Sequence, residues 1–266
     1  MQLLGRGNWP EDMPPIILVA VPTKALSSVV SRLVDQGVRP EALVLCCKGV
    51  EPTTGQLPTE ITASIAEGTQ TFVLSGPGFA KDLAKGRPVA HTLAHSHRAE
   101  ALAQCLSTPN FRLYHCDDPV GVQLCGALKN IIAIAAGIAD GLSLGESARA
   151  ALITRASVEL RRLLVELGGQ ADTLWTMAGI GDLMLTCGSA SSRNFQFGQR
   201  IAMGESVDRA EKAIGTVEGI GGLRGLSVKT DLSQAPICLG LLSILSGAQT
   251  PNDVVATWMA RSIKAG

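Results

Sequence analysis

The first 115 residues alternate short apolar runs with more polar stretches of helical periodicity. The apolar runs predict strands at 16–21, 43–47, 72–74, 89–94 and 111–114. Between the first two runs, Lys24 to Gln36 places apolar residues at helical spacing, and Gly37 supplies a natural stop. Because continuous apolar strands joined by helices are typical of parallel sheets, this half predicts a parallel sheet covered on both faces.

Helical periodicity dominates the rest of the chain. It predicts helices at 119–138, 146–167, 171–177, 192–203 and 206–213, followed by three shorter ones. A short helix is also expected at 81–85, after a glycine-rich turn. The pattern therefore predicts an α/β protein in two parts, a sheet unit at 1–116 and an all-α unit at 117–266.

One charge, Lys129, stands in the middle of the longest apolar helix, 119–138. A helix that is apolar on nearly every face is buried, and burial lowers the pKa of a lysine. Such a lysine can serve as a general base near neutral pH. A structural ion pair is the alternative, and the helix alone does not decide between the two.

The composition is that of an ordinary globular protein, with 23 basic and 23 acidic residues and 46% hydrophobic residues among 266. A balanced charge gives no general electrostatic footprint for nucleic acid or for anionic membranes. No apolar run reaches the length of a membrane span, and the first thirteen residues do not resemble a signal peptide. We therefore expect a cytoplasmic protein.

The cysteines and histidines do not predict a metal site. Seven cysteines without C-x-x-C spacing are best interpreted as reduced core residues. His91 and His95 have the i, i+4 spacing of helical zinc ligands, but the motif lacks the glutamate of zinc proteases and its surroundings indicate a strand. We expect no metal.

Ligands of an open parallel sheet bind beyond the carboxyl ends of its strands. The residues at those places are Val21-Pro22-Thr23, Lys48-Gly49 and the turn Ser75-Gly-Pro-Gly-Phe-Ala80. A glycine-rich turn that leads into a helix offers free N–H groups to an anion. Gly and Pro also mark ordinary turns, so this feature alone leaves the question open.

The helical half contributes three further features. Asp118 and Pro119 form an N-cap and N1 pair that fixes the start of the Lys129 helix. Gly179-Ile-Gly-Asp182-Leu places a carboxylate in a tight turn, and Ser191 to Asn194 caps the helix that runs to Met203. A helix start that carries arginine suits a phosphate, although the tetrapeptide alone favours a solvated arginine beside a conventional cap.

Seven stretches in order resemble the bacterial NAD(P)-dependent sn-glycerol-3-phosphate dehydrogenases. They are Lys48-Gly49, Ser75–Leu83, Gly121–Asn130, Ala150–Arg155, Gly179–Leu183, Ser192–Asn194 and Val217–Gly219. The resemblance runs from about residue 16 to near the C-terminus. It implies a Rossmann-like cofactor domain, here truncated at its N-terminus, at 1–116, and a helical substrate-binding and catalytic domain at 117–266.

The resemblance also implies a reaction and residue roles. The reaction is the reversible reduction of dihydroxyacetone phosphate by NADH or NADPH, which supplies glycerophospholipid synthesis. Lys129 would exchange the proton of the C2 oxygen, Lys48 would stabilise the alkoxide, and Asp182 would set the protonation of Lys129. The implied substrate residues are Lys48, Gly76, Gly78, Lys129, Asp182, Ser192, Arg193 and Asn194. The implied cofactor residues are Lys48, Ala80, Arg193, Thr216 and Glu218.

Two features depart from the family pattern. The chain has no Gly-x-Gly-x-x-Gly turn for the dinucleotide pyrophosphate, so we expect it to enter the fold after the first mononucleotide-binding units, with exposed strand edges. The residues that distinguish NAD from NADP belong to that segment. Gly78 stands where the family usually has Thr or Ser, which puts one hydroxyl contact with the substrate in doubt.

Alternative functions stay open at this point. The chain could be a non-catalytic remnant that binds a triose phosphate or a partner subunit. A dehydrogenase of hydroxyacids is disfavoured, because the Ser192-Arg193-Asn194 helix start suits a phosphate. The sequence does not determine the oligomeric state, for which a homodimer is one option.

Overall fold

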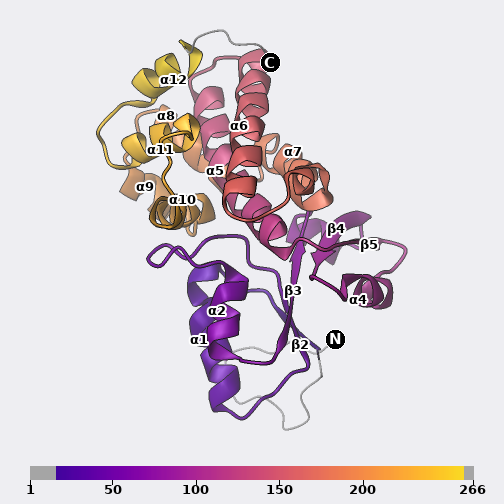
Figure 1. The fold of residues 1–266 in the computed structure, drawn as a ribbon. Coiled ribbons are helices and arrows are strands. Elements are labelled where there is room, and N and C mark those ends of the chain that lie inside the picture. Colours follow the sequence, from indigo (N-terminus) through magenta and orange to yellow (C-terminus); the bar gives the residue numbers. More distant parts are fainter. Residues whose placement is uncertain (1–15, 261–266) are drawn as a thin grey trace.

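Five strands form one sheet in the computed structural model, which describes residues 16–260 (Figure 1). They are β1 Ile16–Val19, β2 Ala42–Leu45, β3 Gln70–Ser75, β4 Val89–Ala94 and β5 Phe111–Cys116. The strands lie side by side in sequence order. All five predicted strands are confirmed, with ends that differ by one or two residues. The prediction about a signal peptide lies outside the described residues.

The direction of β4 corrects the prediction of a parallel sheet. β1, β2 and β3 run parallel, but β4 runs antiparallel to β3, and β5 is parallel to β4. A parallel crossover needs a dozen or more residues, usually with a full helix, to return across the sheet. The connection 76–88 holds only the five-residue helix α3, Ala80–Ala84, so the chain turns back at the same edge. Only the carboxyl ends of β1, β2 and β3 therefore meet at one edge.

Helices cover both faces of the sheet, although not completely. Helices α1, Thr23–Asp35, and α2, Pro58–Ile65, pack on one face, and α4, Ala99–Leu106, packs on the other face over β3 to β5. The sequence pattern located α1 and α3 but not α2 and α4. Beside β1 the second face is open within the described residues, where Leu18 is 42% exposed.

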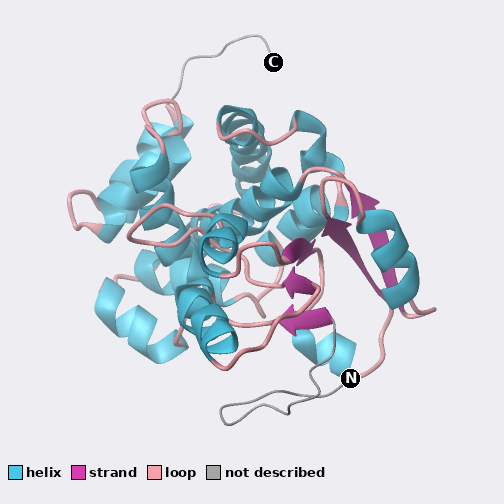
Figure 2. Cartoon of the chain, turned by 60° about the horizontal axis from the view of Figure 1, so that its bottom comes forward, coloured by secondary structure: helices cyan, strands magenta, loops and turns pink. Residues whose placement is uncertain are grey.

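The second half of the chain is helical, as predicted, and lies beside the sheet (Figure 1), and Figure 2 shows how far helices outweigh strands in the molecule. Its helices are α5 Pro119–Gly141, α6 Glu146–Glu166, α7 Asp182–Cys187, α8 Arg193–Ala202, α9 Val207–Ile214, α10 Glu218–Lys229, α11 Pro236–Leu245 and α12 Pro251–Met259. The predicted helix at 171–177 is wrong at its end. A 3₁₀ turn, Ala171–Trp175, stops before Thr176, and a π-helical turn, Met177–Gly181, follows.

Helix α5 is the centre of the fold. Its length and composition would suffice for a membrane span, but its most apolar stretch is buried entirely inside the protein. Glycines let α8 approach it closely. A Cβ atom on Gly137 would lie 2.0 Å from the carbonyl oxygen of Phe195, and one on Gly198 would lie 2.1 Å from that of Ile134. The small residues of α5 thus bring α8 against the turn that carries Lys129.

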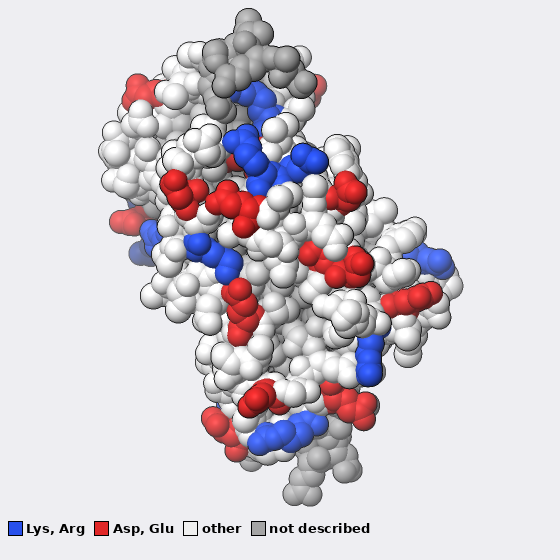
Figure 3. Space-filling model, viewed as in Figure 1, with Lys and Arg blue, Asp and Glu red and all other residues white. Residues whose placement is uncertain are grey.

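Acidic and basic side chains are mixed on the face shown in Figure 3. Ion pairs at the protein surface include Arg200–Glu205 and Arg87–Asp82. Such pairs contribute little to stability, because water screens them. The charges that bear on chemistry lie in the interior.

Candidate active site

Lys129 lies deep in the protein, at a depth set by the start of α5. Asp118 caps this helix by accepting the backbone N–H of Gly121 at 2.8 Å. The Lys129 side chain is 9% exposed, and its ammonium donates to Oδ1 of Asp182 at 2.8 Å and to Oγ1 of Thr186 at 3.0 Å. The buried lysine therefore has two partners, both on α7.

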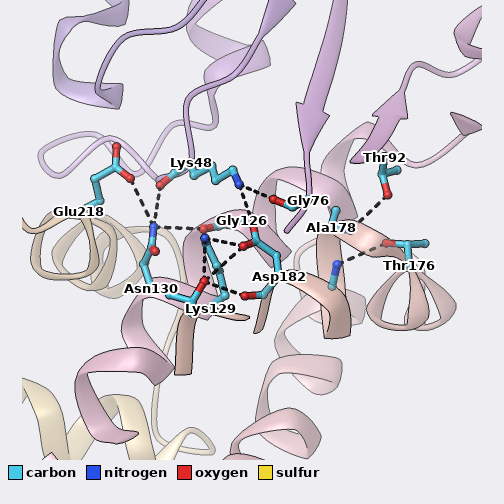
Figure 4. Close-up of polar contacts among 12 residues, drawn as sticks. Lys48, Gly76, Thr92, Gly126, Lys129, Asn130, Thr176, Ala178, Asp182 and Glu218 are labelled. Atoms are coloured by element: carbon cyan, nitrogen blue, oxygen red, sulfur yellow. Dashed lines mark hydrogen bonds and ion pairs between the residues drawn. The ribbon is translucent and has the colours of Figure 1, made fainter. Parts of the chain in front are cut away.

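Asp182 joins Lys129 to a second lysine. Its other oxygen, Oδ2, lies 2.6 Å from the ammonium of Lys48, which comes from the loop after β2 (Figure 4). Lys48 also donates to the carbonyl oxygen of Gly76 at 2.9 Å. Two ammonium groups thus share one carboxylate, and this group of three residues carries a net positive charge.

The turn before Asp182 requires glycine. Gly179 has φ −87° and ψ −106°, and a Cβ atom there would lie 2.1 Å from the carbonyl oxygen of Leu174. The backbone can turn sharply at this point only because no side chain is present. This turn starts α7 directly beneath Lys129 and places Asp182 in its first turn.

The electrostatics confirm that Lys129 is perturbed. Burial lowers the pKa of Lys129, the charge of Lys48 lowers it further, and Asp182 only partly opposes them. Burial by itself would raise the pKa of Asp182. The charges and hydrogen bonds of Lys48 and Lys129 have the larger combined effect, so the pKa of Asp182 is lowered. Asp182 is therefore a carboxylate at neutral pH, and Lys129 loses its proton more readily than a lysine in water.

A second polar network lies next to the first. Asn194 of α8 donates to Oδ1 of Asn130 at 2.9 Å and accepts the N–H of Gly219 at 2.9 Å. Asn130 in turn donates to the carbonyl oxygen of Lys48 at 3.3 Å and to Glu218 at 3.4 Å. This network links α5, α8, α10 and the Lys48 loop, and Figure 4 shows the contacts of Asn130 with Lys48 and Glu218.

The start of α8 is capped as predicted. Ser192 is buried, and its hydroxyl accepts the N–H of Phe195 at 3.3 Å. The next residue, Arg193, is exposed, and its charge lies close enough to lower the pKa of Glu218, which burial raises overall. A helix N-terminus and a guanidinium thus lie beside the two networks.

A cleft of about 210 Å³ opens directly after Lys48, between the starts of α1 and α10. Its lining includes Thr23, Gly49, Thr216, Glu218 and Arg224. The hydroxyl of Thr23 is buried and has no hydrogen-bond partner within residues 16–260. A Cβ atom on Gly49 would lie 2.7 Å from that hydroxyl, so glycine keeps this end of the cleft clear.

The glycine-rich turn after β3 contacts three parts of the protein: the Lys48 loop, the turn before α7, and β4. Gly76 contacts Lys48 through its carbonyl oxygen, and Pro77 packs against Gly181, just before Asp182. Gly78 lies against His91 of β4, and Ala80 is exposed at the start of α3. The structure therefore brings Lys48, Gly76, Lys129 and Asp182 into direct contact, whereas Gly78 and Ala80 lie farther along the turn.

Comparisons with known proteins agree with this geometry. The family profiles for the N-terminal and C-terminal parts of NAD-dependent glycerol-3-phosphate dehydrogenase match residues 12–101 and 118–256. The chain belongs to the NAD-dependent glycerol-3-phosphate dehydrogenase family.

Individual members are similar over nearly the whole chain. The glycerol-3-phosphate dehydrogenase [NAD(P)+] of Beijerinckia indica is 42% identical, over 94% of this chain and 76% of the relative. That of Cereibacter sphaeroides is 41% identical, over 97% and 84%. The crystal structure of the Coxiella burnetii glycerol-3-phosphate dehydrogenase shares 36% identity and a TM-score of 0.84, over 93% of this chain and 77% of that one.

The sequence does not predict two residues that contact the site of this glycerol-3-phosphate dehydrogenase family member, Thr186 and Asn130. Thr186 follows Asp182 at i, i+4 and shares its helix face, which is a signal the spacing could have given. Asn130 follows Lys129 directly, and its importance comes from partners 64 and 88 residues away. No local pattern predicts such partners.

The cysteines and histidines are not gathered into a metal site. All seven cysteines are free thiols. His91 lies in β4, as the strand interpretation predicted. Among residues 16–260, no group of three or more His, Cys, Asp and Glu side chains could hold a metal ion.

Proposed function

We propose that this chain interconverts sn-glycerol 3-phosphate and dihydroxyacetone phosphate with NAD(H) or NADP(H), a step of glycerophospholipid precursor synthesis. The observation that carries the proposal is the buried group Lys129–Asp182–Lys48. It combines a lysine of lowered pKa with a second cation at the same carboxylate. A reaction that moves a proton and creates an alkoxide needs both components.

Lys129 is the proposed general base and acid. During alcohol oxidation, neutral Lys129 takes the proton of the C2 hydroxyl, and during ketone reduction its ammonium returns a proton to the carbonyl oxygen. Asp182 and Thr186 fix the position of its amine by the contacts described above. The lowered pKa of Lys129 makes its neutral form more accessible than that of a lysine in water.

Lys48 is the proposed electrostatic partner. Negative charge develops on the C2 oxygen as its proton leaves, and the net positive charge of the group stabilises that oxygen. Gly76 and Asp182 orient the Lys48 ammonium from two sides. The low exposure of Asp182, 2%, excludes most water, so these interactions are stronger than in solution.

The start of α8 is the proposed site for the substrate phosphate. Its free N–H groups and the helix dipole favour an anion, and the Arg193 guanidinium can bind two phosphate oxygens. Ser192 and Asn194 shape this site, the first as the cap and the second by tying α8 to α5. We place Gly78 on the substrate side of the adjacent turn.

The cleft between α1 and α10 fits the nicotinamide end of the cofactor. It adjoins Lys48, and it presents an unpartnered buried hydroxyl at Thr23 and a glycine at 49 that keeps it open. Thr216, Glu218 and Lys48 would hold the nicotinamide and its ribose there, with Ala80 and Arg193 toward the rest of the cofactor. When bound, the nicotinamide accepts or supplies the hydride.

We also propose roles for the two halves of the chain, a cellular location and an assembly. We assign residues 1–116 to cofactor binding and 117–266 to substrate binding and catalysis. The seven free thiols support a reducing, cytoplasmic location. We propose a small phosphorylated triose as the partner molecule, and a homodimer as the assembly to test by light scattering.

The test is oxidation of NADH or NADPH by the full chain on addition of dihydroxyacetone phosphate. We expect turnover, and a loss of roughly 100- to 10,000-fold in kcat for Lys129→Ala, the range typical of a general acid. Lys212→Ala, on the surface of α9, is the matched control and should keep the activity. If the chain shows no turnover and no cofactor binding, the alternative of a non-catalytic triose phosphate or subunit-binding protein holds instead.

A further inference from the structure

His91 is a buried histidine with no role in the proposed mechanism so far. It is 7% exposed, its ring lies 5.4 Å from that of Phe111, and its Nδ1 has no hydrogen-bond partner in the described part of the chain. Burial and the nearby charge of Lys48 lower the pKa of His91 to about 4. The side chain is therefore a neutral imidazole at physiological pH, held inside with its Nδ1 unsatisfied.

The imidazole fills the space beneath the turn that follows β3. The pairing of β3 with β4 reaches Ser75 opposite Thr92, so Gly76 leaves the sheet beside His91. A Cβ atom on Gly76 would lie 2.7 Å from the Cα of His91, and one on Gly78 would lie 2.8 Å from its Cε1. Gly76 thus rests on the backbone of His91, and Gly78 rests on its ring.

The same turn holds Lys48. The carbonyl oxygen of Gly76 accepts a hydrogen bond from the Lys48 ammonium at 2.9 Å, and Asp182 holds that ammonium from the other side. A shift of the turn would move this carbonyl and release Lys48 on one side. The packing of His91 against the turn is therefore linked to the position of a charged group in the site.

This contact also accounts for the glycine at 78. A side chain at 78 would point at His91, since its Cβ would lie 2.8 Å from Cε1 and 3.1 Å from Nε2 of the ring. The ring has little freedom to yield, because it is buried against Phe111. The imidazole of His91 therefore occupies the space that a side chain at position 78 would need.

We propose that His91 is a positioning residue for the reaction, which supports the Gly76–Gly78 turn from below and so keeps the Gly76 carbonyl in place to orient Lys48. The proposal rests on the proposed function, in which Lys48 stabilises the alkoxide. His91 does not touch the substrate. Its effect reaches the reacting atoms through Gly76 and Lys48 alone.

A cycle of substitutions tests the proposal. Gly78→Ala pushes against the ring, lifts the turn and lowers kcat by roughly 10- to 100-fold, the cost of a displacement of about 1 Å in a catalytic group. His91→Ala removes the ring beneath Gly78, leaves the backbone beside Gly76 in place, and lowers kcat because the turn loses its support at Gly78, with little change in the KM for dihydroxyacetone phosphate. The double variant, in which the new methyl group has room, recovers kcat above that of Gly78→Ala alone. His115→Ala, which removes an exposed imidazole from β5, leaves kcat unchanged.

A second readout does not depend on turnover. The rate at which acetic anhydride modifies Lys48, followed by peptide mass spectrometry, should rise in Gly78→Ala and His91→Ala and fall again in the double variant. A wild-type kcat in His91→Ala, an unchanged Lys48 modification rate, or a double variant no better than Gly78→Ala would each overturn the proposal. If Gly78→Ala does not fold, His91→Ala and its Lys48 modification rate decide alone. Lack of turnover in the wild type would affect the proposed function and leave the modification test valid.

Discussion

The helical side and the sheet side of the site differ in how their buried polar groups are satisfied. On the helical side Lys129, Asp182, Thr186, Asn130 and Asn194 are all hydrogen-bonded to one another or to nearby backbone. On the sheet side, three buried groups have no hydrogen-bond partner within residues 16–260. They are the hydroxyls of Thr23 and Ser75 and the Nδ1 of His91.

The difference separates two tasks. A network in which each member is satisfied is rigid, and it holds the proton-transfer group in one geometry before any ligand binds. Unsatisfied buried groups cost stability, and such groups next to a cleft are explained by partners that a ligand supplies. Variants on the helical side should therefore change catalysis and stability, whereas on the sheet side a variant of Thr23, which lines the cleft, should change cofactor binding.

The largest effect is expected from Asp182→Asn. This change removes the charge between Lys129 and Lys48 and leaves one buried and one partly buried ammonium group without their shared carboxylate. We expect the free energy of unfolding at neutral pH, measured by urea denaturation, to fall by about 3–5 kcal/mol. Because the folded-state pKa of Asp182 is lowered, its contribution is present above the pKa of an unfolded aspartate and is lost as the pH falls through the folded value.

The difference between the wild type and Asp182→Asn should accordingly shrink in acid. Asp231→Asn, at a fully exposed carboxylate, is the control and should change stability far less. Equal stability of Asp182→Asn and the wild type at neutral pH would show that the carboxylate does not hold the two lysines together.

Arg193→Ala should have the next largest effect. Loss of a charged hydrogen bond to phosphate costs about 1.5–3 kcal/mol, so we expect the KM for dihydroxyacetone phosphate to rise roughly 10- to 100-fold, with a smaller change in kcat. Arg200→Ala lies on the same helix and breaks only the exposed pair with Glu205, so it should leave KM unchanged. A KM that rises equally in both variants would point to a general change in α8.

Thr23→Val should distinguish an effect on stability from an effect on cofactor affinity on the sheet side. The Thr23 hydroxyl has no described partner, so its removal should leave the thermal midpoint unchanged or raise it. If the hydroxyl serves the cofactor, NADH or NADPH should bind roughly 2- to 10-fold more weakly in a fluorescence titration.

Thr62→Val is the matched control for Thr23→Val. Its buried hydroxyl donates to the carbonyl oxygen of Pro58 at 2.8 Å, so this variant should lose stability and keep cofactor affinity. A loss of stability in Thr23→Val without a change in affinity would reverse the assignment.

Thr186→Val should act on the pH dependence of the reaction. The change removes a hydroxyl that accepts a hydrogen bond from charged Lys129, so the neutral lysine becomes easier to form. We expect the pH midpoint of alcohol oxidation to fall by about one unit, and Thr186→Ser to restore it. A midpoint that stays or rises in Thr186→Val would mean that this contact does not stabilise the charged form.

The sequence was most informative where the signal is local. The buried helix around Lys129, its Asp118 cap and the start of α8 each depend on residues within one or two turns, and the structure confirms them. The lowered pKa of Lys129 follows from the same local pattern, because a helix apolar on all faces leaves no room for water.

The sequence was least informative where the outcome depends on direction and distance. Strand periodicity is the same in both directions, so the reversal at β4 was missed, and the contact of His91 with Gly78 depends on that reversal. Asn194 was predicted from its helix start, but its bonds to Asn130 and Gly219 come from tertiary packing. Long-range pairs of this kind leave no trace in spacing.

The pH dependence of kcat/KM for the oxidation of sn-glycerol 3-phosphate tests the central claim, that Lys129 is the proton acceptor, most directly. Because the lowered pKa of Lys129 favours its neutral form, we predict that kcat/KM rises with pH and levels off, with a midpoint below the 10.5 of an ordinary lysine. The residual rate of Lys129→Ala should lack this step. A midpoint at or above the ordinary value, or the same step in Lys129→Ala, would contradict the account.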